Sequence, residues 1–201
     1  IAGLLAEVLA AEVPEVANGD VVIKSVARVS GKMSKVAVAR AENNVVDGGS
    51  QDNNNNNNNS VWDPVLACVG VENSRLRAIR ERLGGEVCQI LTWSDNREAM
   101  VAEALFPAQV QHVERAVEEN DDYGDGGRDR GGYQQRRLDK YVAYVNRFDE
   151  AKAIGAGGTN VKLAAALCGC FISVERFEDS AFAYGGGPGV MNNRGGDTRG
   201  G

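Results

Sequence analysis

The sequence predicts an α/β protein of the α+β kind, built from two small modules that each pack helices against a three-stranded sheet. Three observations support this prediction. The 201 residues are 43% hydrophobic, which is enough for ordinary globular cores. The glycines and asparagines gather in a few stretches, so the packed parts are shorter than the whole chain. Finally, two segments repeat one pattern, which indicates that one structural unit occurs twice.

The repeated pattern is an aliphatic residue and a glycine, a short turn, a helix, a Leu-x-Gly step and a strand. It reads CVGVENSRLRAIRERLGGEVCQIL in residues 68–91 and AIGAGGTNVKLAAALCGCFISV in residues 153–174. The first glycine and the leucine of the step are thirteen positions apart in one copy and twelve in the other. Such close agreement in spacing favours two copies of one fold.

A helix and two strands are expected before each repeat. The helical segments place apolar residues three and four positions apart, and the strand segments alternate and are rich in β-branched residues. The helices are predicted at residues 2–12 and 96–105, and the strands at 21–29, 35–40, 109–117 and 140–146. Each half is therefore predicted as helix, strand, strand, short helix, glycine turn, helix, strand.

The predicted domains follow from this order. We expect a first module at residues 1–94, a second at 95–177 and a flexible glycine-rich tail at 178–201. An asparagine-rich insertion at 42–61 and an acidic, glycine-rich insertion at 119–137 lack apolar periodicity. Both are expected to be disordered loops.

The charge of the chain restricts how it can bind nucleic acid. A net charge of −6 and an isoelectric point near 5.0 exclude binding by bulk positive charge. Arginines nevertheless gather at residues 75–82, and acidic residues at 118–122. Any nucleic-acid contact is therefore predicted to be local.

No cofactor, metal or catalytic site is predicted. The four cysteines form no CxxC pair, and the one histidine, His112, is distant from them in sequence. Three of the cysteines lie in apolar stretches, which is typical of reduced core residues in an intracellular protein. His112 is predicted at the surface or at a strand edge, with no nucleophile in a recognisable arrangement. No apolar run approaches the roughly 20 residues that span a bilayer, so no membrane segment is expected.

The turn of the second copy has the form Gly-x-x-Gly. Glycines let the backbone approach phosphates closely, and the helix that follows offers unpaired N–H groups at its positive end. A helix, a Gly-x-x-Gly turn, a helix and a strand form the KH module, which clamps about four nucleotides by their backbone. The candidate RNA-binding residues here are Gly155, Ala156, Gly157, Gly158, Thr159, Asn160 and Lys162.

The first copy keeps the leading glycine but has a glutamate inside the turn and an asparagine in the closing position. Asparagine tolerates a left-handed backbone, whereas the glutamate repels phosphate and the following arginines partly offset that repulsion. The candidate residues here are Gly70, Val71, Glu72, Asn73, Ser74, Arg75, Arg77 and Arg80.

A bare Gly-x-x-Gly also occurs as an ordinary turn between helices, and only the duplicated context favours RNA binding. On the helix after the first turn, Leu76, Ile79 and Leu83 share one face, with arginines beside it. For Arg77 and Arg82, a solvated helix face is the simpler interpretation. The letters GAGGTN at residues 155–160 lack the third glycine of a dinucleotide fingerprint.

Several segments, taken in their order along the chain, resemble the NusA family of bacterial transcription factors. They are EVPEVANGDVVIKSVARVSGKMSKVAVA at 12–39, DPVLACVGVENSRLRAI at 63–79, EALFPAQV at 103–110 and the second repeat. The resemblance covers residues 5–177 apart from the insertions. It implies two tandem type II KH modules, packed side by side, that present one RNA groove.

The resemblance also implies a function. A protein of this family contacts nascent single-stranded RNA, with RNA polymerase and other elongation factors as partners, and modulates pausing, termination or antitermination without catalysing a reaction. The family's first turn has a basic residue and glycine where this chain has Glu72 and Asn73. Its second turn has lysine and glutamate where this chain has Ala156 and Gly157.

Other functions remain open at this point. One is RNA binding in ribosome assembly or translation, since a ribosomal protein shares the type II module. Another is a protein-interaction scaffold. Because the chain starts at Ile1 without a methionine, we expect a fragment, with the family's polymerase-binding domain and barrel upstream. The asparagine- and glycine-rich insertions suggest a plastid stroma homologue; otherwise, the bacterial cytoplasm is expected.

Overall fold

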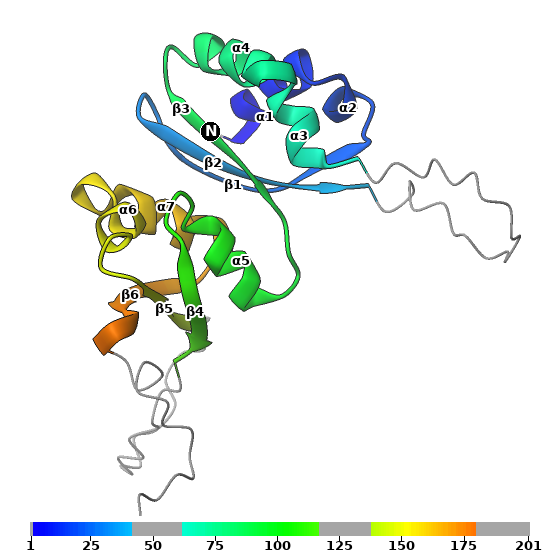
Figure 1. Cartoon of the computed structure of the whole chain (residues 1–201). Coiled ribbons are helices and arrows are strands. Elements are labelled where there is room, and N and C mark those ends of the chain that lie inside the picture. Colours follow the sequence, from blue (N-terminus) through cyan, green and yellow to red (C-terminus); the bar gives the residue numbers. More distant parts are fainter. Residues whose placement is uncertain (1, 42–61, 117–137, 180–201) are drawn as a thin grey trace, which may run out of the picture.

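The computed structural model describes residues 2–41, 62–116 and 138–179 of the chain (Figure 1). The insertions expected at 42–61 and 119–137 lie outside the described residues, as does the predicted tail from residue 180 onward. No helix within the described ranges is long and apolar enough to cross a membrane.

The first module has the predicted order of elements, with one additional short helix near its start. Its sheet has the order β1-β2-β3, with β1 antiparallel to β2 and β2 parallel to β3. The additional helix, α2, begins at Pro14, a residue suited to the first helical position. The elements are α1 (Ala2–Glu12), α2 (Pro14–Ala17), β1 (Val21–Val29), β2 (Met33–Arg40), α3 (Pro64–Val69), η2 (Val71–Asn73), α4 (Ser74–Arg82) and β3 (Val87–Thr92).

The second module repeats this topology. Its sheet has the order β4-β5-β6, again with an antiparallel pair followed by a parallel pair. The elements are α5 (Arg97–Ala104), β4 (Val110–Arg115), β5 (Lys140–Val145), α6 (Glu150–Ile154), η3 (Ala156–Gly158), α7 (Thr159–Cys168), β6 (Phe171–Arg176) and η4 (Phe177–Asp179). The prediction of two α/β modules, each with a three-stranded sheet packed against helices, is therefore confirmed.

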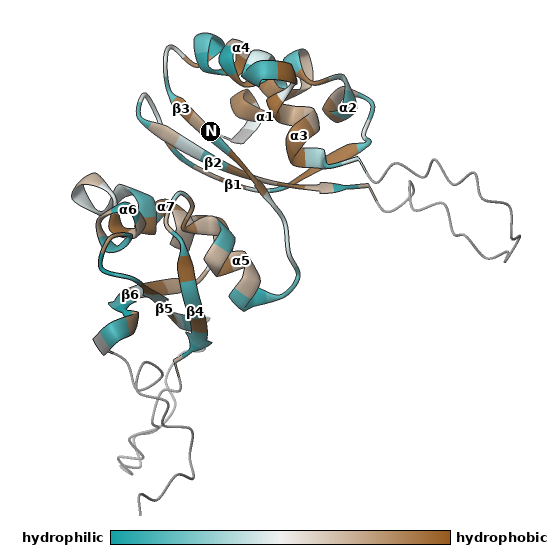
Figure 2. Cartoon of the chain, in the orientation of Figure 1, coloured by the Kyte–Doolittle hydropathy of each residue, from teal (hydrophilic) through white to brown (hydrophobic). Residues whose placement is uncertain are grey.

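The two modules are stacked in layers. Figure 1 shows α1–α4 over one face of the first sheet and α5–α7 between the two sheets. Figure 2 shows hydrophobic residues along the first sheet and hydrophilic residues on α4. Ala27, Ala37 and Leu91, from the three strands of the first sheet, belong to the same buried cluster as residues of α5 and α7. The first sheet is thus covered on both faces, and the second module supplies one of the covers.

Polar contacts reinforce this junction. The fully buried Lys35 Nζ donates to Gln89 Oε1 at 2.7 Å and to the carbonyl oxygen of Phe106 at 2.8 Å. Ser25 Oγ donates to the carbonyl oxygen of Leu167 at 2.8 Å. Burial lowers the pKa of Lys35 to about 8. Apolar packing and directed hydrogen bonds together set the position of the second module on the first.

The cysteines and the histidine lie where the sequence predicts. All four cysteines are buried and free, and burial raises the pKa of the Cys68 thiol to about 11. His112 lies exposed on the edge strand β4, with its ring stacked on that of Tyr144 at 6.0 Å between centroids. Within the described ranges, no group of three or more potential metal ligands gathers.

Candidate nucleic-acid interface

The two glycine turns have the same backbone conformation, although their residues differ. Gly70 has φ 73° and ψ 170°, and Gly155 has φ 73° and ψ 169°. In both turns the leading glycine's carbonyl oxygen accepts from the N–H three residues later, at 3.2 Å in the first turn and 3.0 Å in the second. The agreement shows that the first turn keeps the geometry that its sequence left in question.

The first turn reaches this geometry with side chains in the left-handed region. Glu72 and Asn73 have φ values of 52° and 60°, where the second turn has Gly157 and Gly158 at 62° and 74°. Residues other than glycine rarely adopt this region, and it costs them about 1–2 kcal/mol. The conformation is therefore imposed on the first turn by the two helices that it joins.

The leading glycine is also required by packing. A Cβ at Gly155 would lie 2.7 Å from Asn160 Cβ and 2.8 Å from the Asn160 backbone nitrogen. A Cβ at Gly70 would lie 2.8 Å from Arg75 Cγ and 3.0 Å from Ser74 Oγ. The turn and the following helix thus touch in both modules. The second module makes the contact with the backbone and Cβ of Asn160, and the first makes it with side-chain atoms of Ser74 and Arg75.

Both turns lead directly into a helix whose first N–H groups have no side-chain cap from the preceding residue. Asn73 before α4 and Gly158 before α7 make no capping hydrogen bond. The first N–H of each helix donates within the turn, from Ser74 to the carbonyl oxygen of Val71 and from Thr159 to that of Ala156. The helix start still carries the partial positive charge that suits a phosphate. In the first turn, the exposed carboxylate of Glu72 lies beside this helix start.

The side chains of the second turn divide into two groups. Thr159 Oγ1 donates to the carbonyl oxygen of Ala156 at 2.8 Å, and the exposed Lys162 donates to that of Gly157 at 3.2 Å. Asn160 is buried instead, and its Nδ2 lies 3.0–3.1 Å from the carbonyl oxygens of Leu105, Lys152 and Ala153. Lys162 is therefore placed to meet a ligand at the turn, whereas the side chain of Asn160 positions the turn from within.

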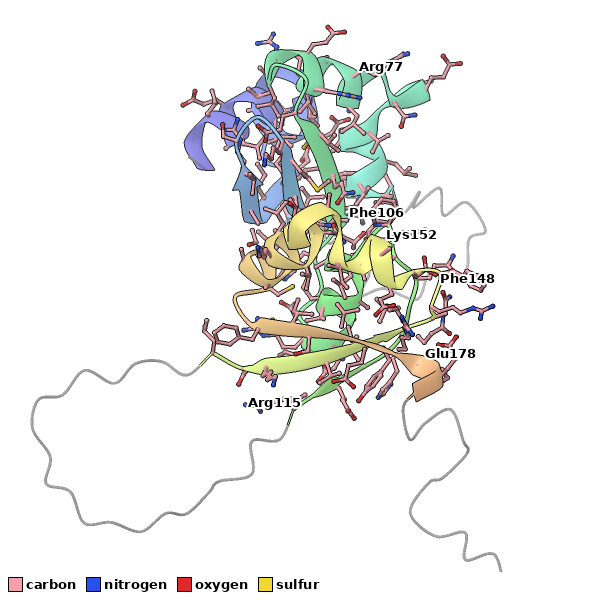
Figure 3. All side chains as sticks on the ribbon, turned by 90° about the vertical axis from the view of Figure 1, so that its left-hand side faces the viewer. Arg77, Phe106, Arg115, Phe148, Lys152 and Glu178 are labelled. Carbon is pink, nitrogen blue, oxygen red and sulfur yellow. The ribbon has the colours of Figure 1, made fainter. Side chains whose placement is uncertain are left out.

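The arginines after the first turn have different surroundings. Arg75 forms an ion pair with Glu15 at 2.7 Å and Arg82 forms one with Glu12, so these two tie α4 to the first two helices. Arg80 Nε donates to the carbonyl oxygen of Gly85 at 3.2 Å. Within the described part of the chain Arg77 takes part in no ion pair, and it lies on the outer surface of the module (Figure 3).

The predicted apolar face of α4 is confirmed. Ile79 is fully buried, Leu83 is 8% exposed and Leu76 packs against the same core. This face holds the helix on the first module and leaves Arg77 and Arg80 exposed on the outer side.

Sequence reasoning did not single out two exposed aromatic rings of the second module. Phe106 is 53% exposed and Phe148 is 71% exposed. The Arg147 guanidinium carbon lies 4.6 Å from the centroid of the Phe148 ring. An Arg-Phe pair directly before the short helix was the available signal, but isolated aromatics in a sequence usually indicate core positions.

Comparisons with known proteins agree with this geometry. The model of the NusA-like first KH domain matches residues 2–51, and that of the NusA-like second KH domain matches residues 97–181. A solved structure titled "Crystal structure of APE1850" has a TM-score of 0.49 at 16% identity, covering 85% of this chain and 95% of that chain, a similarity too low to carry an argument.

Three relatives carry the name "Transcription termination/antitermination protein NusA". The protein of Thermus thermophilus is 34% identical over 88% of this chain and 36% of its own length. That of Halalkalibacterium halodurans is 34% identical over 86% of this chain and 36% of its own length. That of Bacillus subtilis is 32% identical over 89% of this chain and 38% of its own length. The chain spans little more than a third of these curated relatives. Its two domain matches, in the same order as its two modules, show that the chain belongs to the NusA family as a tandem KH region.

Proposed function

We propose that this chain holds single-stranded RNA through its two glycine turns, as the RNA-binding region of a NusA-like transcription factor. The observation that carries the proposal is the twofold occurrence of one turn conformation directly before a helix start that has no side-chain cap. Phosphates bind at such helix starts, and glycines in the turn let a phosphate come close to the backbone because they have no Cβ. No chemical step is part of this function.

The two turns are expected to contribute differently. The second turn combines glycines with the exposed Lys162, while the first combines the carboxylate of Glu72 with the exposed Arg77 and Arg80. Among the remaining candidate residues, Thr159, Asn160 and Arg75 hold the turns and helices in place through their side chains. With so few cationic side chains at phosphates, the dependence of affinity on salt is expected to be shallow.

A pair of double variants tests the second turn. In Gly157→Asp/Gly158→Asp the new carboxylates repel phosphate, whereas Gly157→Asn/Gly158→Asn has side chains of the same shape without charge. Asparagine is a fair control because Asn73 already occupies this conformation in the first turn. In a filter-binding titration with single-stranded RNA, we expect the Asp variant to bind at least about tenfold more weakly than the Asn variant. Equal affinities of the wild type and both variants would remove the second turn from the proposed site.

The role of the whole protein is a further part of the proposal. By relationship to proteins named for termination and antitermination, the chain contacts nascent RNA and modulates polymerase pausing, termination or antitermination, with RNA polymerase and other elongation factors as partners. Affinity purification of the tagged protein tests this assignment. Polymerase subunits are the expected partners, and ribosomal particles in their place would contradict it.

Domain limits and location are also proposed. We assign residues 1–94 and 95–177 to the two modules and 178–201 to a tail. The composition of the insertions supports a plastid stroma location, and the bacterial relatives support a bacterial cytoplasm. Fluorescence microscopy of a tagged full-length protein distinguishes the two.

A further inference from the structure

Two exposed phenylalanines and two cationic side chains lie near α6, the helix that leads into the second glycine turn. We call Phe106, Arg147, Phe148 and Lys152 the aromatic strip. Figure 3 shows Phe106, Lys152 and Phe148 in succession along one side of the second module. An exposed ring next to cations is the pattern by which proteins hold single-stranded nucleic acid, since every base offers a face for stacking.

The position of Phe106 is fixed by its backbone. Its N–H donates to the carbonyl oxygen of Glu103 at 3.0 Å, and its carbonyl oxygen accepts from the buried Lys35 at 2.8 Å. The neighbouring Leu105 carbonyl oxygen accepts from Asn160 at 3.0 Å. The same Asn160 nitrogen lies 3.1 Å from the carbonyl oxygen of Lys152. Phe106 is therefore held at the junction of the modules and next to the helix that leads into the second turn.

Phe106 has no counterpart after α1 in the first module. Val13, between α1 and Pro14, is fully buried, and Leu105, which directly follows α5, is fully buried too. Phe106 stands between Leu105 and Pro107 as an additional hydrophobic residue and is 53% exposed. Packing alone thus accounts for Val13 but not for a large ring left in solvent at position 106. The ring is available to a ligand.

Phe148 and its neighbours continue the strip. Asn146 Oδ1 accepts from the N–H of Phe148 at 2.9 Å, which holds the residue in the turn before α6. Arg147 lies against the ring, and Lys152, 54% exposed, is paired with Asp149 at 2.8 Å. The strip thus offers rings for bases and cations for phosphates, although Asp149 offsets part of the charge of Lys152.

We propose that the aromatic strip stacks bases of the RNA that the second glycine turn holds, with Phe106 as the main platform. This inference rests on the proposed RNA-binding function and adds base contacts to its phosphate contacts. It explains how a chain with a net charge of −6 and few cations at its turns holds RNA. A stacked base contributes binding that does not depend on salt release.

The test uses the full chain and two RNA probes in fluorescence anisotropy. One probe is a labelled 12-nucleotide RNA of mixed sequence, and the other has the same length and charge but abasic riboses. We expect Phe106→Ala to bind the first probe about fivefold or more weakly and the abasic probe as the wild type does. Phe106→Trp is expected to retain affinity, and Phe171→Ala, which removes a ring that is 59% exposed at the start of β6, to leave it unchanged.

The outcomes separate the two proposals. If the wild type binds neither probe, the RNA-binding function fails, and the inference fails with it. If the wild type binds the base-containing probe and Phe106→Ala binds it equally well, the function stands and the strip is overturned. An equal loss by Phe106→Ala on both probes would also overturn stacking, because a loss without bases reports a structural change.

Discussion

The first and second glycine turns share a backbone conformation but hold different residues in it. At the third and fourth positions, Glu72 and Asn73 occupy the left-handed region that Gly157 and Gly158 occupy in the second turn. The helices on either side, packed onto their sheets, therefore determine the path of the turn, and the residues within it determine its charge and its strain. A turn whose sequence departs from the Gly-x-x-Gly motif can thus keep the backbone conformation of the motif while its charge differs.

The largest effect is expected where the turn meets the next helix. Gly155→Ala adds a Cβ 2.8 Å from the backbone nitrogen of Asn160 at a φ of 73°, so we expect about 3 kcal/mol of lost stability. Gly70→Ala has the same φ, but its Cβ meets the side chain of Arg75, which can move. We expect about half that loss. Urea unfolding followed by circular dichroism measures both, and equal losses would mean that the turns have the same packing constraint.

A smaller effect is expected from the charge of the first turn. Glu72→Lys replaces a carboxylate beside a helix start by an ammonium group, and we expect RNA affinity to rise about fivefold at low salt and less at high salt. The control is Glu175→Lys on β6, which changes the net charge equally at an exposed site of the second sheet. A similar gain in both variants would show that overall charge, and not the first turn, is responsible.

The smallest effect concerns the strain in the closing position. Asn73→Gly relieves a left-handed φ of 60° and is expected to stabilise the protein by about 0.5 kcal/mol. The reciprocal Gly158→Asn is expected to destabilise by a similar amount. Thermal unfolding of the two variants checks this pair, and the same sign for both would contradict the view that the turns are equivalent in backbone.

Much of the fold could be predicted because the local patterns agree with the structure. The helix predicted at 96–105 is α5 at Arg97–Ala104, and the strand predicted at 140–146 is β5 at Lys140–Val145. The modules were expected to pack side by side, but the cover that the second module forms over the first sheet was not predicted. Its signal is in β2, where Val36, Ala37 and Val38 are all fully buried, because a strand covered on both faces is apolar without alternation. Lys35 obscured that signal, since a buried lysine in a strand looks like a solvent-facing one.

The candidate site shows a similar division. The turn positions followed from spacing and repetition, but the ion pairs of Arg75 and Arg82 join helices that are far apart in sequence. The inward direction of Asn160 depends on the chain at Leu105, 55 residues away. Such contacts depend on tertiary packing, and no local pattern reports them.

The junction at Lys35 and Ser25 has a consequence for the length of RNA that the protein accommodates. The second module is packed and hydrogen-bonded onto the first sheet. The distance between the two turns is therefore fixed, and the modules do not move independently. A strand held at both turns must bridge that separation with a set number of nucleotides. The pair of modules would then favour RNA in which the two contacted segments are separated by the matching number of nucleotides.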